Sequence, residues 1–174
     1  MNKENPMKNI ELEKVTLNLS AGEAGPKLEK SQKMLENITG KKVVITKTHK
    51  RSTFGVAKGR PIGVKVTIRK GEARELLKKL LGAVDNKIKP SSFDNQGNFS
   101  FGIHEYINIP GVNYDPDIGI LGMDVCITLK RPGFRVKNRR LNKNKIGIKH
   151  NISKEESINF AKNEFGVKLT EDEE

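Results

Sequence analysis

The chain has 174 residues, of which 33 are Lys or Arg and 21 are Asp or Glu, so its formal net charge is +12. Its single Cys excludes an internal disulfide and a zinc site built from cysteines. No apolar run approaches the roughly 20 residues of a membrane-spanning helix, and no signal peptide opens the chain, so a cytoplasmic protein with no membrane partner is predicted.

Strands and helices are interleaved in the first half of the chain. Apolar residues alternate between 10 and 19, with one slip, which predicts a strand. A helix is predicted from Pro26 to a stop at Gly40, and a second strand, with poor alternation, over 42–50. The cleanest strand covers 62–69, and a helix follows over 72–86.

The strand 62–69 has one apolar face and one basic face, as a period of two requires. Lys65 and Arg69 belong to the basic face. The apolar face holds Ile62, Val64, Val66 and Ile68. Since the strands alternate instead of being apolar throughout, we predict an α+β fold, with an antiparallel sheet whose helices pack mainly on one face.

The second half of the chain is richer in turns. A strand is predicted over 98–106, followed by a turn-rich segment over 107–122 and another strand over 123–129. Ser153 to Glu156 forms a capping-box sequence that starts the last helix, and 167–169 is predicted as a short strand. No linker divides the chain, so residues 1–174 are predicted to form a single domain, with an acidic, flexible tail over 170–174.

The positive charge is segregated along the sequence. Residues 37–71 and 125–154 each hold ten Lys or Arg and no Asp or Glu. These two acid-free segments therefore carry +20, and the rest of the chain carries −8. A surface built only for solubility mixes its signs, whereas a segregated field suits a phosphate backbone.

The first acid-free segment is a predicted strand, loop and strand. Phe54 lies in its loop among cations, where an aromatic ring can stack on an unpaired base; the alternative is a loop anchor packed into the core. A solvated charged hairpin is the alternative for the whole segment. Its candidate phosphate contacts are Lys41, Lys42, Lys47, Lys50, Arg51, Lys58, Arg60, Lys65 and Arg69.

The second acid-free segment contains a long basic loop or arm over 131–150, with no clear period. Arms of this composition become ordered when RNA neutralises them. An anionic membrane is a poor alternative, because the segment has no amphipathic stripe. Its candidate RNA contacts are Arg131, Arg135, Lys137, Arg139, Arg140, Lys143 and Lys145.

Catalytic and metal-binding motifs are scarce, and no cofactor is predicted. The three His residues stand in unrelated contexts, and the sequence has neither a Gly-x-Ser-x-Gly elbow nor a Gly-Lys-Ser/Thr phosphate loop. Asp115, Asp117 and Asp124 leave open a Mg²⁺-dependent nuclease, although Asp-Pro is more often a turn. A free-standing regulator bound to DNA is the other alternative.

Several stretches together resemble one family, and in order they are Val15–Ala24, Ile38–Lys47, Phe54–Arg69, Asn98–Ile103, Tyr114–Pro116 and Gly122–Val125. Their order and spacing are similar to those of ribosomal protein five of the large subunit, the 5S rRNA-binding protein, over about residues 8–169. The basic segment 131–150, followed by a Lys-Glu-Glu helix, resembles the archaeal form.

This resemblance implies a non-enzymatic α+β protein of the central protuberance of the large subunit. The implied partners are 5S rRNA, 23S rRNA, P-site tRNA, a neighbouring 5S-binding protein and a protein of the small-subunit head. Lys41 stands where many relatives have Gln, which suggests a phosphate contact there instead of an amide contact. The candidate rRNA-binding residues are Asn18, Lys41, Lys42, Thr46, Lys47, Lys50, Arg51, Phe54, Lys65 and Arg69. The candidate tRNA-binding residues, within the loop 54–61, are Val56, Ala57, Lys58, Gly59 and Arg60.

Overall fold

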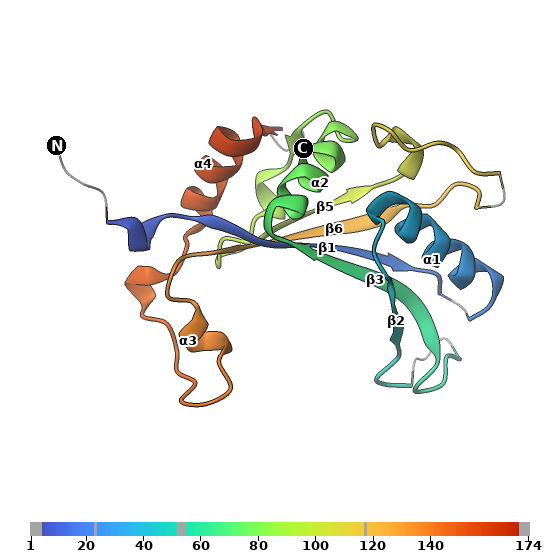
Figure 1. Ribbon diagram of the computed structural model, residues 1–174, viewed down its shortest axis with the longest axis horizontal. Helices are drawn as coiled ribbons and strands as arrows, with labels where there is room; N and C mark the ends of the chain where they lie inside the picture. The colour runs from blue at the N-terminus through green and yellow to red at the C-terminus, as the bar shows by residue number, and fades with distance from the viewer. Residues whose placement is uncertain (1–4, 23, 52–54, 117, 171–174) are drawn as a thin grey trace.

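The computed structural model describes residues 5–22, 24–51, 55–116 and 118–170 (Figure 1). The strands are β1 (Glu11–Ser20), β2 (Val44–Lys47), β3 (Pro61–Arg69), β4 (Lys87–Ile88), β5 (Phe99–Ile103), β6 (Met123–Lys130) and β7 (Lys168–Leu169). The α-helices are α1 (Pro26–Thr39), α2 (Lys70–Gly82), α3 (Arg135–Asn138) and α4 (Lys154–Phe165). Short 3₁₀ turns cover Pro6–Lys8, Pro90–Ser92, Tyr106–Asn108 and Ile148–His150.

The main sheet has five strands in the order β2-β3-β1-β6-β5, and every neighbouring pair is antiparallel. The central strand, β1, shifts its register against β6 between Leu12 and Lys14, where the sequence pattern slips. The predicted α+β fold with an antiparallel sheet is therefore confirmed.

Helices cover one face of this sheet. Figure 1 shows α2 and α4 above the strands in this view, and α1 overlapping their right-hand ends; all three contribute to the core on this face. The side chains of β1 and β3 that face the helices are buried, as the alternation predicts, and they are Val15, Leu17, Leu19, Val64, Val66 and Ile68. The apolar stripes of the first two helices pack against them with Leu28, Met34 and Leu35 from α1 and Leu77, Leu80 and Leu81 from α2. Burial of these stripes supplies the main driving force for the fold.

Three element boundaries differ from the sequence prediction. The helix predicted over 72–86 begins at Lys70 and ends at Gly82, because Asp85 and Asn86 turn the chain with φ of 53° and 56°. This turn leads into β4, which pairs in parallel with β7. The predicted strand 42–50 pairs only over β2, and the predicted strand 98–106 ends at Ile103. Local patterns carry no information on such distant pairings.

Gly63 lies where three strands meet. A Cβ atom added there would lie 2.8 Å from the backbone oxygen of Leu19 and 2.9 Å from Oγ1 of Thr46. We expect Gly63→Ala to lower the free energy of unfolding by about 1–3 kcal/mol, because the backbone of β1 must shift to admit the methyl group. Urea unfolding measures this effect. Gly71→Ala is the matched control, since no atom lies within 4 Å of its added Cβ, and an equal loss of stability in the two variants would contradict the steric explanation.

Candidate RNA interface

The face of the main sheet opposite the helices is uncovered and polar, and we call it the open face. Across β3, β1 and β6, Lys65 lies opposite Asn18, and Asn18 lies opposite Asp124. The open face comprises Lys14, Thr16, Asn18, Val44, Thr46, Lys65, Thr67, Arg69, Ser100, Asp124, Cys126 and Thr128. The alternation of the strands therefore places four predicted rRNA-binding residues, Asn18, Thr46, Lys65 and Arg69, on one surface.

Two cations on the open face lie directly opposite each other. Arg69 of β3 pairs with Lys14 of β1, and among the described residues neither side chain, nor that of Lys65, makes an ion pair with a carboxylate. Like charges directly opposite each other destabilise a sheet. Lys14 was not predicted as a site residue, although its position two residues before Thr16 in an alternating strand is the signal that would have found it. The arrangement suits a surface whose positive charges are neutralised by a polyanion.

A shallow groove of about 490 Å³ continues the open face past the start of β2. It forms because β2 begins at Val44, opposite Lys65, so β3 continues to Arg69 without a partner on that side. Four predicted rRNA-binding residues line it, namely Lys41, Lys42, Lys65 and Arg69. Lys41 differs from the others in that its Nζ lies 2.9 Å from Oε1 of Glu72, so part of its charge is already neutralised.

The loop between β2 and β3 projects beyond the sheet, and we call its described residues, 48–51 and 55–60, the hairpin tip. Thr48 closes its base: its N–H donates to the Arg60 carbonyl at 2.9 Å, and its hydroxyl donates to the Ala57 carbonyl at 2.8 Å. The predicted cations of this region are exposed, and they are Lys47, Lys50, Arg51, Lys58 and Arg60. Of the other predicted residues, Thr46 and Val56 are half-buried, while Ala57 and Gly59 are exposed. Phe54 lies outside the described residues.

The arm, residues 131–150, projects from the other end of β1. Its chain turns through α3 and returns, with the Asn144 N–H donating to the Val136 carbonyl at 3.2 Å. The Arg139 Nε donates to the Asn142 carbonyl at 2.8 Å. Six of the seven predicted basic residues of the arm are exposed, and they are Arg135, Lys137, Arg139, Arg140, Lys143 and Lys145.

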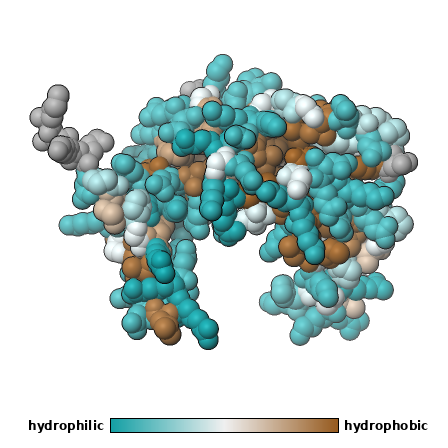
Figure 2. All heavy atoms as spheres, in the orientation of Figure 1, coloured by the Kyte–Doolittle hydropathy of each residue, from teal (hydrophilic) through white to brown (hydrophobic). Residues whose placement is uncertain are grey.

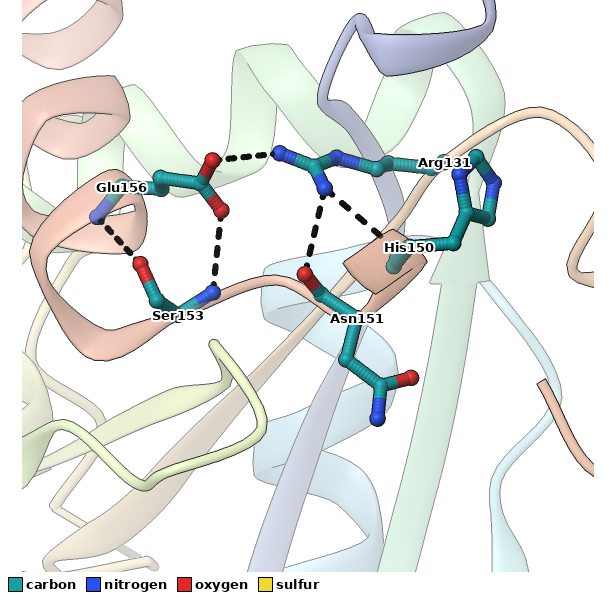
Figure 3. Close-up of polar contacts among 5 residues, drawn as sticks. All are labelled: Arg131, His150, Asn151, Ser153 and Glu156. Carbon is teal, nitrogen blue, oxygen red and sulfur yellow. Dashed lines mark hydrogen bonds and ion pairs between the residues drawn. The ribbon is translucent and has the colours of Figure 1, made fainter. Parts of the chain in front are cut away.

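Arg131 is the exception, because it is buried and its side chain is engaged within the protein, which argues against the predicted contact with RNA. The residue is only 5% exposed, and its guanidinium faces inward (Figure 3). It donates to Oε1 of Glu156 at 2.7 Å, to the Asn151 carbonyl at 3.1 Å and to the His150 carbonyl at 3.4 Å. Arg131 thus joins the two ends of the arm to the start of α4. The sequence pattern could not show this, because the partners lie 19 to 25 residues away.

The contacts of Arg131 with Glu156, His150 and Asn151 form what we call the Arg131 clamp. Glu156 takes part both in this clamp and in the N-terminal cap of α4. The Ser153 N–H donates to its Oε2 at 3.0 Å, and the Glu156 N–H donates to the Ser153 hydroxyl at 3.3 Å, which confirms the predicted capping box (Figure 3). Partial burial tends to raise the pKa of Glu156, but hydrogen bonds from Ser153 and Arg131, together with the arginine charge, outweigh it and lower the pKa.

Because the pKa of Glu156 is lowered, the free energy of unfolding should depend on pH. Because the folded state holds the Glu156 pKa below its ordinary value of 4.5, the carboxylate stabilises the fold at neutral pH and ceases to do so as the pH falls through the folded pKa. We expect Glu156→Gln to be less stable than the wild type at pH 7, with the difference shrinking below pH 4.5. Urea unfolding at several pH values measures it. A difference independent of pH would contradict the role of the charge.

The hairpin tip and the arm, one from each acid-free segment, project on the same side of the molecule. The hairpin tip lies at the Ser20 end of β1, because Gly63 near the start of β3 pairs with Ser20, whereas the arm leaves β6 at Lys130, opposite Glu11 at the start of β1. Ten strand residues separate them, which corresponds to about 30 Å. Figures 1 and 2 show both projections descending from the sheet, away from the helices, with a broad concavity between them. The fold therefore brings the basic segments together around the open face.

The described residues give no support to the metal-dependent nuclease. No group of three or more His, Cys, Asp or Glu side chains that could hold a metal ion occurs among them. Asp124 lies on the open face, Asp115 donates its N–H to the Tyr106 hydroxyl at 3.0 Å in a loop, and Asp117 lies outside the described residues. Within the described part of the chain, no helix is long and apolar enough to cross a bilayer.

Comparison with known proteins agrees with this geometry. The family model described as ribosomal protein L5 matches residues 5–56, and the model described as the C-terminus of the same ribosomal protein family matches residues 61–160. Proteins named large ribosomal subunit protein uL5 are similar over nearly their whole length. The one from Sulfolobus acidocaldarius is 52% identical over 97% of this chain and 96% of its own. The one from Sulfurisphaera tokodaii is 54% identical over 96% of each chain, and the one from Nanoarchaeum equitans is 50% identical over 95% of this chain and 99% of its own. The chain therefore belongs to the ribosomal protein L5 family.

Proposed function

We propose that this protein is a structural, non-enzymatic component of the large ribosomal subunit that holds rRNA against its open face, its hairpin tip and its arm. The main support is that the hairpin tip and the arm, one from each acid-free segment, project on the side of the sheet that the helices leave uncovered. Family membership supports the assignment to the cytoplasmic ribosome and the absence of catalysis.

The finer proposal concerns the RNAs and their contacts. The open face and the groove bind 5S rRNA, with Lys42, Lys65 and Arg69 on phosphates and Asn18 on a base or sugar edge. The arm extends the contact to 23S rRNA in the central protuberance. Phosphate contacts supply affinity and position, whereas Asn18 and Phe54 test the shape of the RNA. The candidate rRNA contacts of the hairpin and its strands are Lys41, Thr46, Lys47, Lys50 and Arg51.

The hairpin tip has a separate role in this proposal. Lys58 and Arg60 are exposed just before the start of β3, where the tip can contact the P-site tRNA without disturbing the open face. The bridge to the small-subunit head and the contact with a neighbouring 5S-binding protein come from the family resemblance alone.

The decisive experiment is selection of RNA by the purified protein at moderate salt. We expect 5S rRNA to be enriched from total RNA, because affinity at low salt reflects only the net charge. Sedimentation of cell extracts distinguishes the ribosomal protein from the alternative, a DNA-bound regulator. A ribosomal component sediments with the large subunit, whereas a free-standing regulator does not. Failure to select 5S rRNA, combined with sedimentation away from the subunit, would overturn the proposal.

Cys126 supplies a native probe of the open face. It is exposed beside Thr16, and burial together with the charge of Asp124 raises the pKa of its thiol, so alkylation is best followed at mildly alkaline pH. Bound 5S rRNA should slow alkylation by N-ethylmaleimide if RNA covers the sheet. An unchanged rate with RNA saturating the protein would move the contact off the open face.

A further inference from the structure

A pocket of about 590 Å³ lies between the arm and the turn that precedes β5. Its apolar lining comes from Phe134 and Ile146 of the arm and from Ile152, which is 1% exposed. The volume falls within the range of small-ligand sites. The sequence pattern did not predict this pocket, because its apolar residues are separated along the chain and come together only in the folded arm.

Both walls of the pocket are held in place before any ligand binds. On one side, Oδ1 of Asp94 accepts hydrogen bonds from the N–H groups of Gln96 and Asn98 at 2.8 and 2.7 Å, and the Ser157 hydroxyl donates to the Gly97 carbonyl at 2.7 Å. On the other side, the Phe134 ring packs edge-on against His150, with the centroids 5.8 Å apart. The Arg131 clamp fixes the base of the same wall. A preformed site loses less conformational entropy on binding.

Three lysines surround the apolar floor. Lys137, Lys143 and Lys145 line the pocket, are exposed, and make no ion pair with any described carboxylate. An apolar floor within reach of three free ammonium groups fits a ligand that has both a flat apolar face and an anionic group.

Three amide side chains complete the lining, those of Gln96, Asn144 and Asn151. Amides match the donors and acceptors on the edge of a nucleobase, whereas the apolar side chain of an acidic peptide has no edge to hydrogen-bond. We propose that this pocket binds a single unpaired nucleotide of rRNA, with its base against Phe134 and Ile146 and its phosphates near the lysines. This inference rests on the proposed function as an rRNA-binding protein and deepens it.

The test compares a single-stranded eight-nucleotide RNA with a duplex of the same sequence, both titrated into the full chain and followed by NMR. A base must be unpaired to enter the pocket, so we expect the single strand, and not the duplex, to shift the amide signals of Ile146 and Asn151. The signals of Lys65 and Arg69 on the open face should respond to both RNAs. Response of the open face without response of the pocket overturns this inference alone, whereas silence at both overturns the proposed function as well.

Two double variants separate the pocket from general charge. We expect Lys143→Gln with Lys145→Gln to weaken binding of the single strand by about tenfold while weakening that of the duplex much less. Arg140→Gln with Lys149→Gln removes the same charge from exposed arm residues outside the pocket lining and should weaken both RNAs equally. Equal behaviour of the two double variants contradicts the proposal.

A filling substitution and a peptide complete the test. Gln96→Trp, at an exposed position, should occupy the pocket and abolish the preference for the single strand without changing the thermal stability. An eight-residue peptide of Glu, Asp, Leu and Phe should leave the pocket signals unshifted. If this peptide shifts them more than the single-stranded RNA does, the pocket is a protein-binding site and the proposal is wrong.

Discussion

Replacing Lys65 and Arg69 together by Gln is expected to weaken binding of 5S rRNA by about tenfold or more at moderate salt. Both side chains lie on the open face and line the groove, with no carboxylate partner among the described residues. If each contacts one phosphate, the slope of log affinity against log salt should fall by about 2. Filter binding over a series of salt concentrations measures both quantities.

The matched control removes the same charge from the opposite side of the sheet. Lys78 and Lys79 are exposed on α2, which packs on the helix-covered face, so the same double substitution there should leave the affinity nearly unchanged. Stability gives a second check. Because Arg69 lies opposite Lys14, its replacement should leave the free energy of unfolding unchanged or raise it by up to about 1 kcal/mol. An equal loss of affinity in both double variants would assign the effect to net charge instead of to the open face.

Replacing Arg131 by Ala is expected to have the largest effect on stability among these substitutions, about 2–3 kcal/mol. The change leaves Oε1 of Glu156 and the carbonyls of His150 and Asn151 without the donor that Arg131 supplies, and it opens a space at a buried position. The lower part of the usual range applies because the Glu156 side chain is 44% exposed. Thermal or urea unfolding measures the loss.

Loss of the Arg131 clamp should also make the arm more susceptible to proteolysis. In Arg131→Ala the two ends of the arm separate, so trypsin should cleave at Arg139 and Arg140 faster than in the wild type. Arg135→Ala, an exposed residue of the same arm, is the control and should change neither stability nor the cleavage rate at those sites. Arg131→Lys should fall between the two, because an ammonium keeps the charge but loses the planar fork that spans three acceptors. Unchanged cleavage in Arg131→Ala would show that the arm is held by other contacts.

Much of the site could be predicted because the strands alternate. The alternation of side chains along residues 62–69 assigns Lys65 and Arg69 to one face of the strand. The pairing of this strand with β1 then brings Asn18 to the same surface. Arg131 shows the limit of this reasoning. It stands in the same acid-free segment as Arg135 and Lys137, and nothing local distinguishes a buried arginine from an exposed one. Its role depends on Glu156, which lies 25 residues away.

The amino-acid sequence by itself determined the alternation of the strands, the capping box of α4 and the segregation of charge, because each depends on residues near one another along the chain. Only the tertiary structure decided that the hairpin tip and the arm project from the same side of the sheet, that the groove at the start of β2 gathers four cations, and that the buried Arg131 joins the two ends of the arm. These features depend on antiparallel pairing and on contacts between distant residues. Packing of the helices on one face leaves the other face, with its unneutralised charge, open to a partner.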